Sequence, residues 1–483
     1  MDRHVASNAI GYNVRLPARE KPLNESDASH RGWKPLVFLF LILFTVYNSN
    51  LRPIAAGDSL PTSLIPFSII LDGSITLDRF GPYLDRTVPY APNLIHRARG
   101  HWYSIYPLAG PILSAPLYLP IAFIPGIRRQ SPGALVAIAR IIEKVTASIW
   151  AAGTAAFLFL LLRRITSSRA AWMLALCFAL GTENWAISSQ AMWPHTFGGL
   201  AIVGCLYCIE RWSGPELEPR WYWLAGGFAA CAVAIRPTNL ILLPALAISL
   251  WCGHACLRRY AQVFTLPVLA GTLIAAYNFA LFHALSGWYP STLGGSWLDG
   301  FAGILLSPGR GMLIYTPIAI FALGAFGSRA RESRQKHCQT FVAASVICVM
   351  QIAIIAGWVG WEGGYCWGPR LLTEAFPGFT VLIAIGLPAF WRSAWRLAFA
   401  GTAIYCGLIQ ALGVYCYPKG HWDHLPVSVI QSRARLWDWK DNPIVRTARG
   451  GPVWEPYAIV AAAVEGGWPA GAKKLHELGI QPY

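Results

Sequence analysis

Residues 35–61 of the chain read PLVFLFLILFTVYNSNLRPIAAGDSLP. The first half is an uncharged apolar run that starts at Leu36, and the second half is more polar and carries one carboxylate, Asp58. Such a run is typical of a helix that crosses a bilayer, which needs on the order of 20 residues. Because no small-residue cleavage site follows it, we expect a permanent anchor rather than a removed signal peptide.

The composition extends this interpretation to the whole chain. Of 483 residues, 55% are hydrophobic and only 13% are charged, and the mean hydropathy is +0.43. Soluble domains contain about 25% charged residues, so roughly half of the usual charge is missing. A soluble protein of this length has no core large enough to bury that much apolar surface. We therefore predict an all-α polytopic membrane protein.

Eleven apolar runs are long enough to cross a bilayer. They start near Leu36, Ala139, Ala170, Thr196, Trp221, Asn239, Gln262, Met312, Thr340, Thr373 and Leu397. With the N-terminus in the cytoplasm, the inner connections contain 19 Lys and Arg residues, whereas the short outer connections contain three. The positive-inside rule therefore predicts this orientation in the cell membrane.

This orientation divides the chain into three parts. Residues 1–34 are expected to form a cytoplasmic tail, residues 35–416 the transmembrane domain, and residues 417–483 a small extracytoplasmic tail. The outer loop 52–138 contains the segment 106–126, whose five prolines predict broken helices in the outer interface rather than another crossing. Because the inner loops are short, we expect the function to face the extracytoplasmic side.

Several function classes are disfavoured by what the sequence contains. The net charge of +16 does not indicate nucleic-acid binding, because the basic residues lie in short loops between apolar runs. The 11 cysteines follow no metal-ligand spacing, and no Walker, GxGxxG or HExxH motif is present, so we predict no metal and no cofactor. The apolar runs hold almost no ionisable residues, which argues against an ion-coupled transporter.

Asp58 is the first candidate for catalysis. It stands beside Gly57, a few residues beyond the first apolar run, where a carboxylate is well placed to take a proton from an acceptor hydroxyl or amine. The alternative is that Asp58 caps a helix that begins at Leu60 or Pro61. The two roles are compatible with each other.

Three arginines interrupt otherwise uncharged outer connections: Arg236, Arg310 and Arg370. Their Gly and Pro neighbours predict tight turns with free backbone N–H groups, and the guanidinium fork matches phosphate oxygens. The three together predict a site for a lipid-linked phosphate or diphosphate. The alternative is that each arginine pairs with an outer carboxylate or a lipid headgroup.

Aromatic residues flank acidic ones in the same loops. Glu183 precedes Trp185, and Glu362 follows Trp361, which are pairings that bind sugar rings in many proteins, although an interfacial aromatic belt is the safer interpretation of each residue. His195 follows a proline at the start of an apolar run, a position more often structural than catalytic.

The layout of residues 35–420 resembles the GT-C superfamily of membrane glycosyltransferases, in the branch of protein O-mannosyltransferases and lipid A aminoarabinose transferases. The resemblance rests on Gly57-Asp58-Ser59, on Tyr106-Pro107-Leu108, and on the turns 307–311 (SPGRG) and 367–373 (WGPRLLT). It implies a polyprenyl-phosphate-linked sugar as donor and inverting transfer on the outer face, without a nucleotide-sugar domain.

The resemblance also implies roles for individual residues. Asp58 would be the general base, the three arginines would hold the donor phosphate, and Glu183 and His195 would line the acceptor side, with Tyr106 and Glu362 as further sugar or acceptor contacts. Two positions depart from the family pattern: Ser59 stands where many relatives have a second acid, and Tyr106 stands where a lysine is frequent. We therefore expect a single-base mechanism in which arginines bind the phosphate.

Two other functions use the same features. A carrier or flippase for a lipid-linked saccharide would need the arginine and aromatic surfaces without bond chemistry, and a non-catalytic subunit would use the outer tail to dock a partner. The polar residues gather at one face rather than at the midplane, which favours the enzyme. The acceptor, whether lipid, glycan or protein, is left open by the sequence.

Overall fold

The computed structural model describes residues 33–55, 57–214, 218–287 and 294–477, so nearly all of the predicted tail 1–34 lies outside the described residues. Among these residues the chain is almost entirely helical, with one antiparallel hairpin that pairs Ile95 with Ser104. The hairpin strands are β1 (Ile95–Ala98) and β2 (His101–Ser104).

The helices follow in chain order. The α-helices are α2 (Lys34–Asn48), α3 (Ser59–Asp72), α4 (Gly81–Thr87), α5 (Ala109–Ala122), α6 (Pro132–Ile165), α7 (Ser168–Gly181), α8 (Pro194–Trp212), α9 (Pro219–Ile235), α10 (Leu242–Cys252), α11 (Leu257–Phe282), α12 (Trp297–Leu306), α13 (Met312–Tyr315), α14 (Arg331–Lys336), α15 (Cys338–Ala356), α16 (Phe376–Phe390), α17 (Trp395–Cys416), α18 (Pro443–Gly450) and α19 (Glu455–Glu477). The 3₁₀ segments are η1 (Ala91–Asn93), η2 (Ile127–Arg129), η4 (Pro237–Ile241), η5 (Pro317–Phe326), η6 (Ser328–Ala330), η7 (Arg370–Ala375) and η8 (Arg433–Trp437), and η3 (Asn184–Ser188) is a π-turn.

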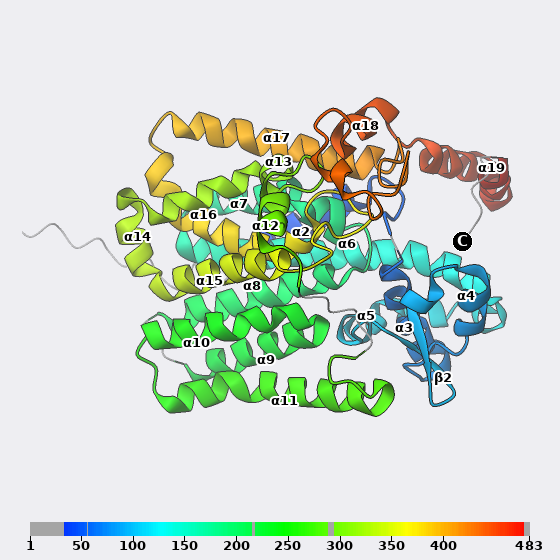
Figure 1. Cartoon of the computed structure of the whole chain (residues 1–483), viewed down its shortest axis with the longest axis horizontal. Helices are drawn as coiled ribbons and strands as arrows, with labels where there is room; N and C mark the ends of the chain where they lie inside the picture. The colour runs from blue at the N-terminus through cyan, green and yellow to red at the C-terminus, as the bar shows by residue number, and fades with distance from the viewer. Residues whose placement is uncertain (1–32, 56, 215–217, 288–293, 478–483) are drawn as a thin grey trace, which may run out of the picture.

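The long helices run side by side along the long axis of the molecule (Figure 1), as expected for a multi-pass membrane protein. Each of the eleven predicted runs coincides with helical structure. Within the described residues, five helical stretches are long and apolar enough to cross a membrane unaided: Pro132–Ile165, Leu257–Phe282, Cys338–Ala356, Arg370–Phe390 and Trp395–Cys416. The all-α polytopic class is confirmed, and eleven crossings stay a prediction.

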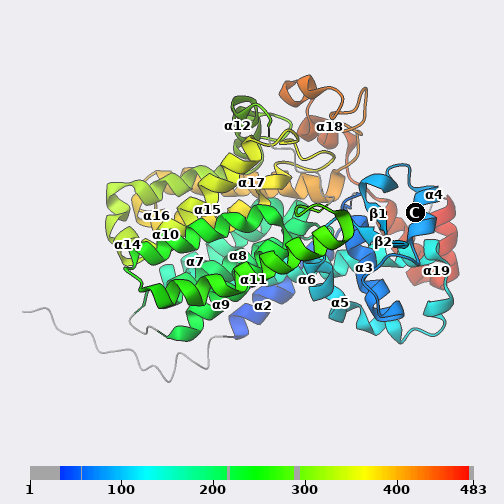
Figure 2. The same ribbon diagram turned by 60° about the horizontal axis from the view of Figure 1, so that its bottom comes forward.

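The two ends of the bundle differ in structure. One end carries the β1–β2 hairpin with α3, α4, α5 and α19, and we call it the hairpin end. The opposite end carries α14 and the connection between α16 and α17, and we call it the basic end because residues 329–336 and 392–396 supply six arginines and lysines there. Figure 2 shows the same separation after rotation.

Most of the predicted interfacial segment 106–126 forms one continuous helix, α5, with Pro116 and Pro120 inside it, so the predicted break at the prolines is wrong. It packs against α3 on one side. Its other side leaves a row of apolar residues exposed: Ile112, Leu113, Leu117, Leu119 and Phe123. A helix with such an unburied apolar face fits contact with lipid, and its position in the interface stays a prediction.

α6 begins earlier than its predicted start near Ala139. The Ser131 side chain accepts a hydrogen bond from the backbone N–H of Ala134 at 3.3 Å, and Pro132 occupies the first helical position. A capping serine followed by proline favours a helix start, so the helix extends several residues into the hairpin end. This extension places Arg140 and Glu143 beside α3 rather than at the tip of a loop.

Residues 417–477 fold onto the bundle rather than standing apart. The Ser307 hydroxyl donates to the carbonyl oxygen of Leu436 at 2.6 Å, and the Tyr457 hydroxyl donates to that of Ser49 at 2.9 Å. Helices α18 and α19 lie beyond α17, with α19 at the hairpin end (Figures 1 and 2). The predicted small C-terminal piece is therefore attached at two separate points of the transmembrane domain.

Small residues set the spacing between α9 and α11. A Cβ added at Gly226 would lie 2.6 Å from the backbone carbonyl oxygen of Val263, whereas one at the neighbouring Gly227 would first meet Leu266 at 3.9 Å. We predict that Gly226→Ala lowers the free energy of unfolding by about 1–3 kcal/mol, because a backbone atom has little room to yield. Gly227→Ala is the matched control, and thermal unfolding of the purified proteins in detergent measures both. Equal melting temperatures for Gly226→Ala and wild type would contradict this packing.

Candidate functional site

Asp58 lies immediately before α3 at the hairpin end. Its carboxylate forms no capping hydrogen bond to the helix, so the capping alternative is wrong. Instead it accepts a hydrogen bond from Nη1 of Arg370 at 2.7 Å, across 312 positions of sequence. The Asp58 side chain is 29% exposed and that of Arg370 10% exposed, so the pair is accessible from the Asp58 side.

Arg370 is held by a turn and an aromatic ring. Its Nη2 donates to the carbonyl oxygen of Gly363 at 2.6 Å, and its guanidinium lies 4.2 Å from the ring centre of the buried Trp193. Gly363 and Gly364 have φ values of 74° and 69°, which glycine adopts without strain. The turn therefore aims a carbonyl at the arginine while leaving its Nη1 directed at Asp58.

α6 supports the chain next to Asp58. Arg140 donates to the Ser59 hydroxyl at 3.1 Å and to Glu143 at 2.7 Å, and Glu143 in turn accepts from the backbone N–H of Met192 at 3.0 Å. This i,i+3 ion pair therefore connects three segments. It fixes the start of α3, and with it the position of Asp58.

Arg236 and His195 meet at a carboxylate that the sequence analysis did not single out, Glu374. Nη1 of Arg236 donates to Glu374 at 2.6 Å, Asn239 donates at 2.8 Å, and Nδ1 of His195 lies 3.3 Å away. Glu374 is completely buried and Arg236 is 3% exposed. Arg370 and Glu374 are four residues apart in one segment, so this buried cluster is directly connected to the Asp58–Arg370 pair.

Arg310 is also fully buried, and its partners lie in the C-terminal piece and the Gly363 turn. It donates to Asp423 at 2.6 Å and to the carbonyl oxygens of Glu362 and Gly364 at 3.1 and 2.9 Å. Its guanidinium also lies over the ring of Trp422, 5.3 Å from the centre. Arg310 therefore connects residues 417–437 to the loop that carries Arg370.

All three predicted arginines thus pair with a carboxylate in the structure. The partners are Glu374 for Arg236, Asp423 for Arg310 and Asp58 for Arg370. Pairing with a carboxylate was the alternative interpretation of these residues. The three pairs differ in exposure, because only Asp58 among the carboxylates is substantially exposed.

Glu183 occupies a separate buried polar cluster. The Thr316 hydroxyl lies 3.0 Å from each of its carboxylate oxygens, and the Gln410 amide donates at 3.2 Å. Within the described residues no cation pairs with it. Burial raises the pKa of the Glu183 carboxyl to about 7, even though these hydrogen bonds act in the opposite direction.

Glu362 lies beside the site, whereas Tyr106 belongs to the apolar packing of the hairpin end. The Glu362 carboxylate lies 3.4 Å from Arg433 and is nearly buried, next to the glycine that contacts Arg370. Tyr106 packs, partly buried, against the apolar cluster of the hairpin end. Among the described residues, no group of three His, Cys, Asp or Glu side chains is placed to hold a metal ion.

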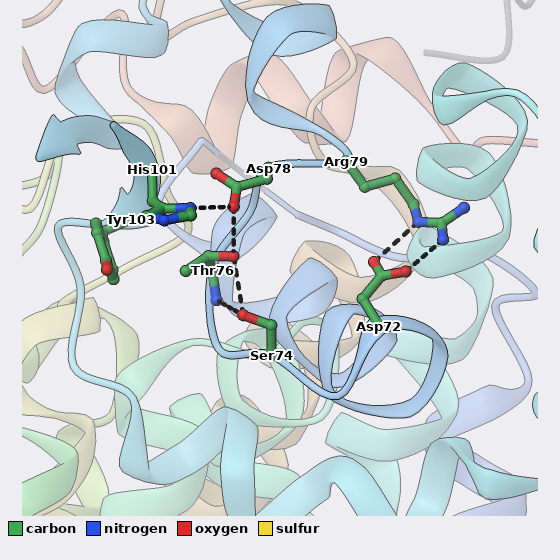
Figure 3. A pocket seen from close by; sticks show the side chains of 7 residues that line it. All are labelled: Asp72, Ser74, Thr76, Asp78, Arg79, His101 and Tyr103. Atoms are coloured by element: carbon green, nitrogen blue, oxygen red, sulfur yellow. Dashed lines mark hydrogen bonds and ion pairs between the residues drawn. The ribbon is translucent and has the colours of Figure 1, made fainter. Parts of the chain in front are cut away.

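A cavity of about 660 Å³ lies at the end of α3 that carries Asp72 (Figure 3). The length of α3 separates it from Asp58 by roughly 20 Å. It is lined by Asp72, Ser74, Thr76, Asp78, Arg79, His101 and Tyr103. Its charged groups pair with one another, Arg79 with Asp72 and His101 with Asp78. Burial raises the pKa of Asp78, but hydrogen bonds from the Trp102 N–H and from His101 outweigh it and lower the pKa overall. The cavity therefore offers hydroxyl groups rather than an unpaired charge.

The helical bundle carries an ion-pair site at one end and a helix-and-hairpin insertion after its first helix. The fold is similar to that of a crystal structure of ArnT from Cupriavidus metallidurans bound to undecaprenyl phosphate. The two chains are 13% identical with a TM-score of 0.53, over 91% of this chain and 73% of that one. This similarity confirms the kind of fold that the sequence resemblance implied.

Other comparisons add less. A crystal structure of the Archaeoglobus fulgidus oligosaccharyltransferase tethered with an acceptor peptide aligns with a TM-score of 0.46 and 13% identity, over 94% of this chain and 60% of that one. No family model and no curated protein matches the chain.

Sequence reasoning missed two of the residues that organise the site. Glu374 carried a usable signal, because it stands four residues after Arg370 in WGPRLLTEAF, where one helical turn brings two charges together. Asp423 carried none, since it is one of several acids in a polar tail and only the fold brings it to Arg310.

The Glu374 cluster leaves no space at Gly198 of α8. A Cβ there would lie 1.8 Å from a carboxylate oxygen of Glu374, whereas one at Gly199 would meet Thr154 at an ordinary 3.4 Å. We predict that Gly198→Ala displaces the carboxylate and destabilises the protein by about 3–5 kcal/mol, because Arg236 then loses its partner inside the bundle. Thermal unfolding compared with Gly199→Ala tests this, and equal stability of the two variants would contradict it.

The raised pKa of Glu183 predicts a pH-dependent stability. The folded carboxyl binds its proton more tightly than the unfolded one, so the free energy of unfolding falls as the pH rises from about 4.5 to about 7, by on the order of 3 kcal/mol. Glu183→Gln removes this contribution, and its melting temperature should fall less over that range than that of wild type.

The control for this measurement is the exposed Glu332→Gln, which should keep the wild-type slope. A wild-type slope in Glu183→Gln would show that folding does not raise the pKa of Glu183.

Proposed function

We propose that this chain is an integral-membrane glycosyltransferase that moves a sugar, a hexose or a pentose, from a polyprenyl-phosphate donor to an acceptor on the extracytoplasmic face. The observation that carries the proposal is the Asp58–Arg370 pair, a carboxylate and a guanidinium 2.7 Å apart and partly exposed. It lies at the hairpin end of a GT-C-type bundle. The ArnT structure with that fold holds undecaprenyl phosphate, a lipid of the class that the donor requires.

The pair suggests an order of events. In the structure, the Asp58 carboxylate accepts a hydrogen bond from Arg370. When the donor phosphate binds, its oxygens take hydrogen bonds from the Arg370 guanidinium, which matches phosphate geometry, and Asp58 is released. Donor binding thereby prepares the base, so that the acceptor is deprotonated only when the donor is present.

The transfer then needs one base and one cation. Asp58 takes the proton of the acceptor hydroxyl or amine, whose oxygen or nitrogen forms a bond to the anomeric carbon. The bond between that carbon and the phosphate oxygen breaks, and its electron pair leaves with the polyprenyl phosphate, giving inversion. Arg370 stabilises the charge that develops on the leaving phosphate at the membrane boundary.

The other predicted residues either position the Arg370 segment or are candidates for contacts to the sugar or acceptor. Arg236 and Arg310 are buried and bonded to protein groups, so we assign them to positioning the Arg370 segment rather than to the phosphate directly. His195 has the same positioning role through Glu374. Glu362, beside the site, and Tyr106, in the hairpin end, are the candidates for contacts to the sugar or acceptor.

Asp58→Asn tests the proposal. We expect transfer to fall by roughly 10²–10⁴-fold, because asparagine cannot accept the acceptor proton. Purified membranes receive a panel of radiolabelled polyprenyl-phosphate sugars, and label transfer is compared at matched expression. Asp85→Asn, an exposed aspartate of α4, is the charge-matched control and should transfer at the wild-type rate.

The outcomes separate the rival functions. Equal transfer by wild type and Asp58→Asn would remove Asp58 as the base. If no donor in the panel gave transfer, yet donor binding was lost in Arg370→Gln, the result would favour a carrier for lipid-linked saccharides over an enzyme.

A further inference from the structure

A cavity of about 710 Å³ lies at the basic end, on the opposite side of the bundle from Asp58. Its lining comes from the C-terminal end of α6, from η6 and α14, and from the C-terminal end of α16 with the residues that follow it. One part of its lining is basic and hydroxylic, and the other part is apolar and aromatic. The basic and hydroxylic part consists of Arg329, Arg392, Thr166 and Ser333. The apolar and aromatic part includes Leu387 and Trp391.

The two arginines of the cavity are not neutralised by the protein. Both are exposed, and neither forms an ion pair or a hydrogen bond with any residue in the described part of the chain. Neighbouring Arg334 is different, because it donates to the carbonyl oxygen of Ala325 at 2.7 Å and so holds η5 to α14. The cavity therefore carries two positive charges without a carboxylate partner, unlike the three arginines around the Asp58 site.

The apolar part of the lining continues onto the outside of the bundle. Trp391 is 41% exposed, and on the adjoining η5 Leu323 and Phe326 are 67% and 55% exposed. η5 packs against α16, the helix that supplies Leu387, so exposed apolar residues lie on an element next to the one that lines the cavity. A ligand that fills the cavity and follows this apolar wall must combine an anionic head with apolar chains.

We propose that this cavity binds the phosphate headgroup of an anionic glycerophospholipid, whose acyl chains lie along the exposed faces of α16 and η5. Basic pockets between transmembrane helices bind such headgroups, and the guanidinium groups of Arg329 and Arg392 supply charge-assisted hydrogen bonds to phosphate oxygens. The hydroxyls of Thr166 and Ser333 reach the polar part of the headgroup. The inference is independent of the proposed transfer reaction, since it rests on the other end of the molecule.

The test measures lipid binding to the full-length protein in detergent. Wild type is titrated with phosphatidylglycerol and, separately, with zwitterionic phosphatidylcholine, and the rise in melting temperature gives the apparent affinity. We expect phosphatidylglycerol to stabilise wild type more than phosphatidylcholine. The double variant Arg329→Gln with Arg392→Gln should bind phosphatidylglycerol roughly 30-fold more weakly, because each basic residue contributes separately to anionic lipid binding.

A matched double variant controls for charge. Arg169→Gln with Arg396→Gln removes two exposed arginines from the same end, outside the cavity, and should bind phosphatidylglycerol like wild type. Replacing Arg329 and Arg392 by lysine keeps the charge and should retain most of the binding. Native mass spectrometry should find one phosphatidylglycerol fewer on the glutamine variant of the cavity than on the control.

Two results would overturn the proposal. One is equal loss of binding in the control double variant, which would mean that the whole basic end attracts lipid without a site. The other is full stabilisation by glycerol 3-phosphate or inorganic phosphate alone, which would mean that the cavity takes free phosphate and does not use the apolar wall.

Discussion

Arg370 and Glu374 place opposite charges four residues apart in η7, directly before α16, and both charges have partners from distant parts of the chain. Arg370 takes the carboxylate of Asp58, and Glu374 takes Arg236 together with His195. Removing one partner of a buried ion pair costs about 3–5 kcal/mol. The residue before α3, the start of α8 and the residue before η4 therefore have to meet at the Arg370–Glu374 segment. The geometry of the candidate site follows from this requirement.

Because these ion pairs join distant segments, the sequence predicted local features of the fold but not the partner of each charge. Apolar runs act locally, so the helical bundle was predictable from run length and composition, whereas the continuous helix in residues 106–126 was predicted to be broken by its prolines. The arginine positions were predictable as well, because a charge in an apolar loop stands out in sequence. Their partners were not, since choosing Asp423 for Arg310 among the acids of the tail depends on long-range packing.

Position in the sequence also could not separate catalytic candidates from structural ones. Asp58 occupies the position of a helix cap, yet its carboxylate turns to Arg370, because Arg140 and Ser59 already hold the start of α3. Glu183 and His195 lie in loops that look accessible in sequence, but both are buried. What distinguishes Asp58 from these residues is its partial exposure, a property that only the packing of several helices determines.

The arginines at the two ends of the bundle differ in burial and in pairing, and these two properties determine which of them can bind a ligand. Arg310 and Arg236 are buried and each is bonded to a carboxylate, so they can hold loops in place but are not accessible from solvent. Arg329 and Arg392 are exposed and unpaired among the described residues, so they attract anions but hold nothing in place. Arg370 lies between these extremes, because its backbone and ring contacts are buried while its carboxylate partner reaches solvent. A cation that keeps its position while exchanging one anion for another is what transfer from a phosphate donor demands.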